Sequence, residues 1–186
     1  FAHQVPFYGP IFLCADDKHA KSIMAKISRP IVTYGLKNKV DIQAVNIKHT
    51  GNMVNFDVID KKYGHNEFNI TINFPGEHFV RNTLAAIAIG LEYGVSKNNI
   101  QKALTNFKGV ARRYEIYNNV LIEGKRIKVI DDYGHHPTEI EAVLRATKKG
   151  FRNKKINLVF QPHRFSRTKD CYEEFIRVLK IPDRIF

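Results

Sequence analysis

The 186-residue sequence predicts an α/β protein in which a mixed sheet with helices is followed by a parallel α/β unit. Two observations lead to this prediction. Residues 41–74 contain three segments in which apolar and polar residues alternate, as they do in half-buried strands. Residues 126–179 instead alternate apolar strand patterns with helical periods, an order that is typical of parallel sheets with right-handed crossovers.

The first part opens with a short apolar strand at residues 11–14. Asp16 and Asp17 then open a helix, because carboxylates near a helix N-terminus interact favourably with its dipole. The β-branched run at residues 30–34 predicts a second strand. The alternating segments that follow predict an antiparallel meander, with strands at 41–48, 53–61 and 67–74.

Two helices follow the meander. Apolar residues recur at three- and four-residue steps over 80–91, and Gly94 suits the end of that helix. Ser96 is a favoured N-cap for the second helix. We expect a domain boundary shortly after it, so that the domains are residues 1–110 and 111–186.

The second domain alternates strands and helices. The strands are expected at residues 126–130 and 156–160, and the helices at 137–149 and 167–179. Pro137 suits the first position of its helix, because proline lacks the N–H that would be unpaired there.

The composition indicates a cytoplasmic protein without a nucleic-acid or membrane partner. The formal net charge is +12, but the lysines are scattered, which favours solvated faces over a polyanion-binding surface. No apolar run has the length of a membrane span, and no signal peptide is visible. Cys14 and Cys171 have no CxxC partner and are expected to be buried thiols in a reducing compartment.

Polar residues follow each strand of the second domain, at residues 131–139 (DDYGHHPTE) and 161–168 (QPHRFSRT). Ligands of open α/β sheets bind beyond the carboxyl ends of the strands. Each cluster also leads into a helix N-terminus, whose free N–H groups favour anions. If the two strands are neighbours, the clusters face one crevice.

Each residue of these clusters also has a structural interpretation. Asp131 or Asp132 would serve only to cap the loop, and we expect His136 to be only a helix N-cap. A zinc site at the adjacent histidines is disfavoured, because neighbouring side chains point apart and no third ligand is evident. Arg164 and Arg167 are either surface charges or, as their place beside a helix start favours, ligands of a carboxylate or phosphate.

Two further candidates lie outside these clusters. Asn82 stands in a mainly apolar helical segment, where its amide either reads a base or makes a structural hydrogen bond. Arg113 stands at the domain boundary, where it either reaches a phosphate or pairs with an acid. The sequence contains no GxxxxGK[ST] phosphate-binding loop.

Several of these segments together resemble the Mur ligases over essentially the whole chain. They are VPFYG and CADD near the start, GEHFVRNTLAAIAIG, GVARRYE, DDYGHHPTEI and FQPHRFSRT. The resemblance is strongest to members that join L-alanine to UDP-N-acetylmuramate. It implies the C-terminal part of a central ATPase-type domain at 1–110, followed by the N-terminal part of a Rossmann-like C-terminal domain at 111–186.

The resemblance implies an ATP-dependent carbon–nitrogen ligase of peptidoglycan precursor synthesis. ATP phosphorylates the lactyl carboxylate of UDP-N-acetylmuramate, the amine of L-alanine attacks the acyl phosphate, and phosphate leaves. Mg²⁺ neutralises the phosphates of ATP. An arginine-lined cleft between domains meets the need for charge stabilisation and alignment.

The resemblance also assigns roles to residues. For ATP, Asn82 contacts the adenine, Arg113 the terminal phosphate and Asp132 the ribose. The family usually has Asn after the histidine of the adenine-binding helix, where this chain has Phe79.

For the other substrates, Tyr133 and His135 line the place where alanine meets the muramate. Arg164 and Arg167 hold a substrate carboxylate or the developing charge. The implied catalytic residues are His135, Arg164 and Arg167, and no metal ligand is assigned.

The chain begins at Phe1 without a methionine and ends as a new strand starts, so we expect an internal fragment of a longer protein. The family's UDP-sugar domain, P-loop and usual magnesium ligands are expected outside it, and the isolated chain is expected to be inactive. One alternative is the related ligase that recycles a murein tripeptide, whose pattern has Phe-Ala where this chain has Tyr133-Gly134. The others are a basic nucleic-acid-binding module and a non-catalytic nucleotide-binding remnant.

Overall fold

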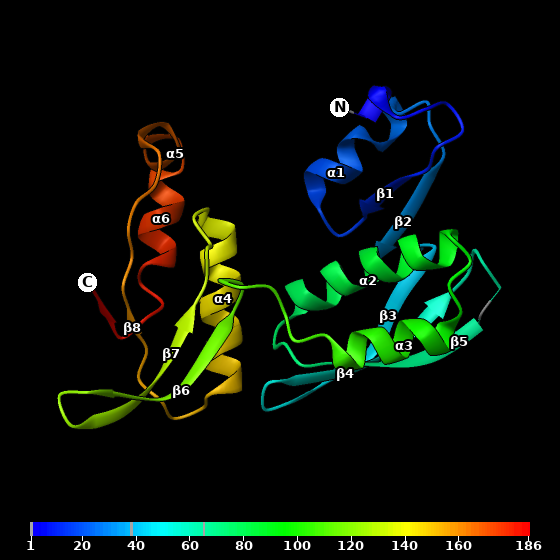
Figure 1. Ribbon diagram of the computed structural model, residues 1–186. Helices are drawn as coiled ribbons and strands as arrows, with labels where there is room; N and C mark the ends of the chain where they lie inside the picture. Colours follow the sequence, from blue (N-terminus) through cyan, green and yellow to red (C-terminus); the bar gives the residue numbers. More distant parts are fainter. Residues whose placement is uncertain (1, 38, 65) are drawn as a thin grey trace. The chain divides into compact units, whose positions relative to one another are not determined.

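The computed structural model describes residues 2–37, 39–64 and 66–186. The chain divides into two compact units, which are described separately (Figure 1). Unit 1 comprises Phe1–Asn73 and Glu77–Phe107, and unit 2 comprises Phe74–Gly76 and Lys108–Phe186.

Unit 1 is built on a five-stranded mixed sheet in the order β1-β2-β3-β4-β5 (Figure 1). The first three strands run parallel, and β3, β4 and β5 form the predicted antiparallel meander. Alternation places one side of each meander strand in the core. The strands are β1 (Ile11–Cys14), β2 (Ile31–Gly35), β3 (Ile42–Thr50), β4 (Met53–Asp60) and β5 (Asn66–Ile72).

Two helices supply the other half of the unit 1 core. Helix α2 packs against β1, β2 and β3, and α3 packs against β5 (Figure 1). The predicted helix ends are confirmed: Gly94 has a φ of 72°, and the Ser96 hydroxyl accepts a hydrogen bond from the Asn99 N–H. The helical segments are η1 (Ala2–Gln4), α1 (Lys18–Ile23), η2 (Met24–Lys26), α2 (Glu77–Glu92) and α3 (Lys97–Asn106).

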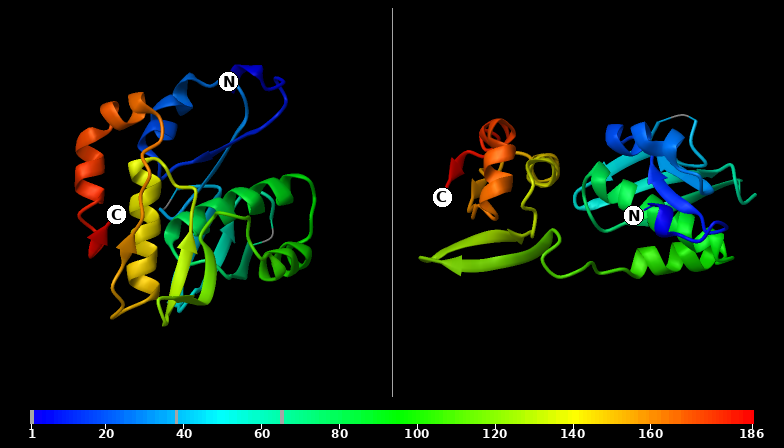
Figure 2. Two further views of the ribbon diagram at one scale, coloured as in Figure 1. Left: turned by 60° about the vertical axis from the view of Figure 1, so that its left-hand side comes forward. Right: turned by 90° about the horizontal axis from the view of Figure 1, so that it is seen from above.

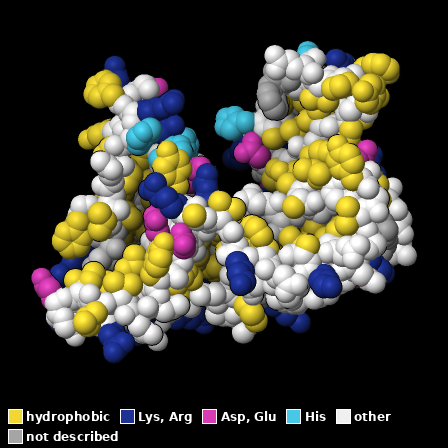
Figure 3. Space-filling model, viewed as in Figure 1, with side chains coloured by type: hydrophobic (Ala, Val, Ile, Leu, Met, Phe, Trp, Pro, Cys, Tyr) yellow, Lys and Arg dark blue, Asp and Glu magenta, His cyan; other side chains and the backbone are white. Residues whose placement is uncertain are grey.

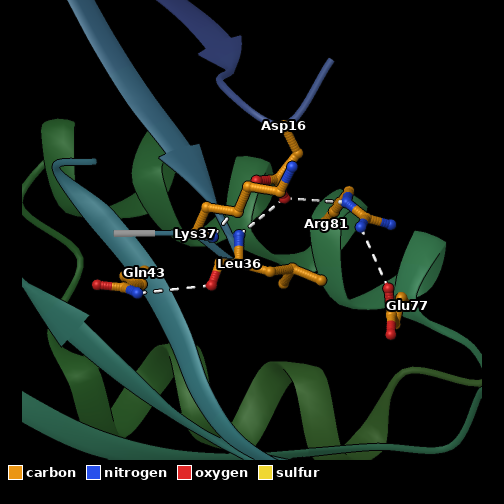
Figure 4. Close-up of polar contacts among 6 residues, drawn as sticks. All are labelled: Asp16, Leu36, Lys37, Gln43, Glu77 and Arg81. Carbon is orange, nitrogen blue, oxygen red and sulfur yellow. Dashed lines mark hydrogen bonds and ion pairs between the residues drawn. The ribbon is translucent and has the colours of Figure 1, made fainter. Parts of the chain in front are cut away.

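A buried carboxylate, that of Asp16, joins β1, the end of β2 and helix α2 (Figure 4). Its side chain is 5% exposed. Oδ2 accepts hydrogen bonds from the Leu36 N–H at 2.8 Å and from Arg81 Nε at 3.1 Å, and Oδ1 accepts one from the Lys37 N–H at 3.3 Å. A Cβ at Gly35 would lie 3.0 Å from Oδ1, so this close approach favours glycine there.

The helix that was predicted to open at Asp16 and Asp17 therefore uses only one of them. Asp17 is the N-cap of α1, and its Oδ1 accepts a hydrogen bond from the Ala20 N–H at 2.7 Å. Asp16 faces the interior and serves the neighbouring strand and helix instead.

Unit 2 contains two small sheets and three helices (Figures 1 and 2). Strands β6 and β7 form an antiparallel hairpin, and β8 and β9 pair in parallel. The α/β fold class is confirmed, and Ile140, Leu144, Phe175 and Val178 form the core of this unit. The elements are β6 (Glu115–Ile122), β7 (Lys125–Asp131), α4 (Pro137–Gly150), β8 (Asn157–Leu158), α5 (Phe165–Asp170), α6 (Tyr172–Val178) and β9 (Arg184–Ile185).

The strands of unit 2 differ from the prediction. Strand β6 was not predicted, because Asn118 and Asn119 interrupt its apolar alternation. They lie in a bulge, where Asn119 has a φ of 58°. Strand β8 has two residues where five were expected, and within the described residues it pairs with β9 and not with β7.

The last predicted helix and the two cysteines also differ from expectation. The helix begins at Phe165 and is divided into α5 and α6 at Cys171, whose φ and ψ of −109° and 26° are not helical. The backbone hydrogen bonds from Cys171 to Arg167 and from Phe175 to Cys171 persist across the break. Both Cys14 and Cys171 are free thiols, but they are half-buried and not buried.

Helix α4 begins with hydrogen bonds between its N-cap and Glu139. His136 is the N-cap, as predicted, and its Nδ1 accepts a hydrogen bond from the Thr138 N–H at 3.3 Å. Glu139 Oε2 accepts hydrogen bonds from the N–H groups of His135 at 3.0 Å and His136 at 3.2 Å. Partial burial opposes ionisation, but these two hydrogen bonds, together with the charges of His135 and Arg113, outweigh it and hold the pKa of Glu139 below its ordinary value.

None of the described helices combines the length and the apolar composition that crossing a membrane requires.

Replacing Asp16 with alanine should destabilise the chain by about 2–4 kcal/mol, because two backbone N–H groups and the Arg81 guanidinium lose their buried acceptor. Asp17→Ala removes only an exposed N-cap and should cost about 1 kcal/mol. Urea unfolding measures both values. Equal losses for the two variants would contradict the role given to Asp16.

The lowered pKa of Glu139 predicts a stability contribution that is present above the unfolded-state pKa of about 4.3 and is lost as pH falls through the folded-state pKa. Urea midpoints measured from neutral to acid pH should therefore fall more steeply for the natural chain than for Glu139→Gln. Glu174→Gln, which removes an exposed carboxylate, is the control. If the difference in urea midpoint between the natural chain and Glu139→Gln stays constant with pH, the prediction is refuted.

Candidate functional site

The loop between β7 and α4 is held from inside by Asp132. Its Oδ1 accepts a hydrogen bond from the Gly134 N–H at 2.7 Å, and its Oδ2 accepts one from the Tyr114 N–H at 2.9 Å. A Cβ at Gly134 would lie 2.7 Å from Oδ1, so glycine lets the carboxylate approach this closely. Asp132 therefore caps the loop, and each oxygen retains capacity for a further hydrogen bond.

Tyr133 and His135 stack on the outside of this loop. Their ring centroids lie 5.3 Å apart in an edge-on arrangement, and His135 Nδ1 is 3.0 Å from the Tyr133 carbonyl oxygen. The Arg112 guanidinium lies 5.1 Å from the centre of the Tyr133 ring, and its Nε is 3.6 Å from Asp131 Oδ2. Tyr133 is nearly half exposed, so this stack presents an aromatic surface to solvent.

The second loop, between β8 and α5, approaches the first through His163. The His163 and His135 ring centroids are 6.2 Å apart. Arg167 Nη1 donates a hydrogen bond to the His163 carbonyl at 3.2 Å. The two polar clusters therefore come together, although β7 and β8 are not hydrogen-bonded neighbours among the described residues. Figure 3 shows histidine side chains gathered with charged groups at this end of unit 2.

The guanidinium groups of Arg164 and Arg167 have N–H donors left to bind a ligand. Neither forms an ion pair with a carboxylate in the described ranges 2–37, 39–64 and 66–186. Arg164 is exposed and holds the N-cap position of α5 with a φ of 67°, a left-handed conformation that costs a non-glycine residue free energy. Such unpaired guanidinium groups suit planar carboxylates and phosphates.

The remaining candidates are not part of these two loops. Asn82 is in unit 1, exposed on α2, and makes no side-chain hydrogen bond to another described residue, so its structural interpretation gains no support. Arg113 is exposed at the start of unit 2, and its charge helps lower the pKa of Glu139. In the described part of the chain, no three His, Cys, Asp or Glu side chains are arranged to hold a metal ion.

Three residues of the site were not assigned a role from the sequence. Glu139 holds the loop backbone, Arg112 covers the Tyr133 ring, and His163 joins the second loop to the first. The capping pattern His136-x-x-Glu139 would have pointed to the first of these. Nothing in the sequence pattern identifies Arg112 or His163, because each contacts a residue from a different segment of the chain.

The chain is similar to curated proteins along its whole length. The curated UDP-N-acetylmuramate–L-alanine ligase of Vesicomyosocius okutanii is 46% identical over 185 residues, which cover 100% of this chain and 39% of that protein. The enzyme of the same name from Neisseria gonorrhoeae is 43% identical over 188 residues, which cover 100% of this chain and 40% of that protein. The chain thus spans about two fifths of the length of these relatives.

Solved structures show the same fold. UDP-N-acetylmuramate–alanine ligase MurC from Thermotoga maritima matches with a TM-score of 0.67 and 31% identity, over 83% of this chain and 33% of that one. A murein peptide ligase from Psychrobacter arcticus matches with a TM-score of 0.60 and 28% identity, over 86% and 32%. MurF from Acinetobacter baumannii has a TM-score of 0.79 at 21% identity, over 99% and 39%, which is a likeness of fold alone.

Two family models together match most of the sequence. The Mur ligase middle domain matches residues 1–90, and the Mur ligase, glutamate ligase domain matches residues 112–186. The resemblance found in the sequence motifs is therefore confirmed, and the chain belongs to the Mur ligase family.

Proposed function

We propose that the full-length protein containing this chain joins L-alanine to UDP-N-acetylmuramate, with ATP consumed through an acyl-phosphate intermediate, in cytoplasmic peptidoglycan precursor synthesis. Residues 1–110 would be the C-terminal part of its central ATP-binding domain, and residues 111–186 the N-terminal part of its C-terminal domain. The main support is the 43–46% identity to enzymes of that name along the whole chain.

The geometry of unit 2 supports an acyl-transfer site. Two loops bring an imidazole, an exposed tyrosine ring and two unpaired arginines to one end of the unit. In this proposal Arg164 and Arg167 hold a substrate carboxylate and offset the charge that develops as the amine attacks. Tyr133 and His135 line the place where the amine meets the acyl group.

Three residues are proposed as nucleotide contacts, as the sequence resemblance implied. Asn82 offers an exposed amide to the adenine, and Asp132 retains lone pairs for the ribose hydroxyls. Arg113 offers a guanidinium to the terminal phosphate. The family's chemistry also implies Mg²⁺. Among the described residues, no three His, Cys, Asp or Glu side chains are arranged to hold it.

The tripeptide-recycling ligase is the second candidate, because a murein peptide ligase is among the similar structures at 28% identity. The Tyr133-Gly134 pair favours the alanine enzyme, as the sequence resemblance implied. A nucleic-acid-binding role is less favoured, because Arg164 and Arg167 lie together at the start of α5 and are not spread along one face of the unit. A remnant that binds a nucleotide without turnover remains the third alternative.

Phosphate release from ATP by the full-length protein should require both UDP-N-acetylmuramate and L-alanine, and the 186-residue chain alone should release none. A colorimetric phosphate assay with each substrate omitted in turn measures this. Release with a murein tripeptide in place of alanine would move the assignment to the recycling enzyme. Release by the isolated chain would overturn the expectation that it is inactive.

Arg164→Ala and Arg167→Ala should each lower kcat/KM of the full-length enzyme about 100-fold, because each removes a charge that stabilises the transition state. Arg177→Ala, an exposed arginine of α6 that pairs with Glu141, is the matched control and should change kcat/KM less than about 2-fold. Equal losses in all three variants would indicate a general effect of surface charge.

A further inference from the structure

The two adjacent histidines of the site are held in opposite tautomers. His135 Nδ1 lies 3.0 Å from the carbonyl oxygen of Tyr133, and a carbonyl only accepts, so this nitrogen carries the proton. His136 Nδ1 instead accepts the Thr138 N–H at 3.3 Å, so in its neutral ring the proton is on Nε2. The neutral His135 ring therefore keeps a lone pair on Nε2, which has no hydrogen-bond partner among the described residues.

The position of the His135 ring depends on Glu139. Glu139 Oε2 accepts the His135 N–H at 3.0 Å and the His136 N–H at 3.2 Å, and it lies 3.9 Å from His135 Nδ1. The carboxylate thus fixes the backbone that carries the ring, and its charge favours a proton on the nearer ring nitrogen. The other groups that face His135 are Tyr133 on its own loop and His163 on the second loop, while Arg113 acts on Glu139.

We propose that Glu139 is a positioning residue that fixes His135 in the Nδ1–H tautomer, so that Nε2 accepts a proton from the amine of the incoming amino acid. This inference rests on the proposed ligase function. The amine nitrogen forms a bond to the carboxyl carbon of the acyl phosphate, and the bond from that carbon to the phosphate oxygen breaks. Phosphate leaves with the electron pair, and the proton lost by the nitrogen passes to Nε2 and then to water.

The tautomers can be observed directly in the 186-residue chain. Long-range ¹H–¹⁵N spectra of the ¹⁵N-labelled chain should show the proton on Nδ1 of His135 and on Nε2 of His136, with His135 assigned by its loss in His135→Gln. Glu139→Ala should convert His135 to a tautomer mixture. The histidines of unit 1 serve as the internal reference, because the N–H groups of both His135 and His136 bond to Glu139. Glu139→Gln keeps an oxygen that can accept the N–H groups and should retain the Nδ1–H form.

Glu141→Ala is the matched control, because Glu141 lies on the same helix and pairs with Arg145 and Arg177 away from the loop. Its His135 signals should not change. If Glu139→Ala does not fold, Glu139→Asp withdraws the carboxylate by one methylene and should give the same mixture. The proposal is overturned if His135 keeps the Nδ1–H tautomer in folded Glu139→Ala or Glu139→Asp. It is also overturned if the natural chain already shows a mixture of tautomers at His135.

In the full-length enzyme, Glu139→Ala should lower kcat about 10- to 100-fold with the KM for ATP unchanged, and Glu139→Gln should restore most of it. If Glu139→Ala raises the KM for ATP or for L-alanine and leaves kcat unchanged, the positioning role is overturned. The enzyme assay and the spectra test different hypotheses. If the natural enzyme makes no amide with alanine, the proposed function is refuted, whereas the spectra test the role of Glu139 independently.

Discussion

The architecture of the site depends on carboxylates that accept hydrogen bonds from backbone N–H groups. Strand β7 ends and helix α4 begins within a few residues, and the turn between them leaves N–H groups without partners in either element. Four such groups, in this turn and at the start of β6, donate to Asp132 or Glu139. The loop that these groups fix carries Tyr133 and His135, whose rings meet edge to face.

In unit 1, a carboxylate likewise accepts backbone N–H groups where the parallel strands end. Asp16 follows β1 and accepts the N–H groups of the residues that follow β2, and Arg81 from helix α2 completes its coordination. A buried carboxylate is costly unless it is paired, and this one has three donors. The helix on which Asn82 lies is thereby tied to the sheet one residue away from that amide.

The sequence was informative where local patterns decide the structure and uninformative where contacts between segments do. The meander was predictable because β3, β4 and β5 alternate cleanly, and the His136 cap because it precedes a proline-started helix. Strand β6 was missed because a bulge at Asn118 and Asn119 breaks its period. The approach of the two loops was expected only if β7 and β8 were neighbours, yet a contact between His135 and His163 joins the loops without such pairing. The roles proposed for Asn82, Arg113, Arg164 and Arg167 stay predictions.

The double use of Asp132 has a thermodynamic consequence. Its two oxygens already accept N–H groups from the entry to β6 and from the loop after β7. A hydroxyl that bound the same carboxylate would depend on the position that both segments give to these oxygens. Nucleotide occupancy and loop order would then be reciprocally linked, each changing the equilibrium of the other by the same free energy. A mutation that loosens the hairpin would therefore weaken nucleotide affinity without touching the nucleotide.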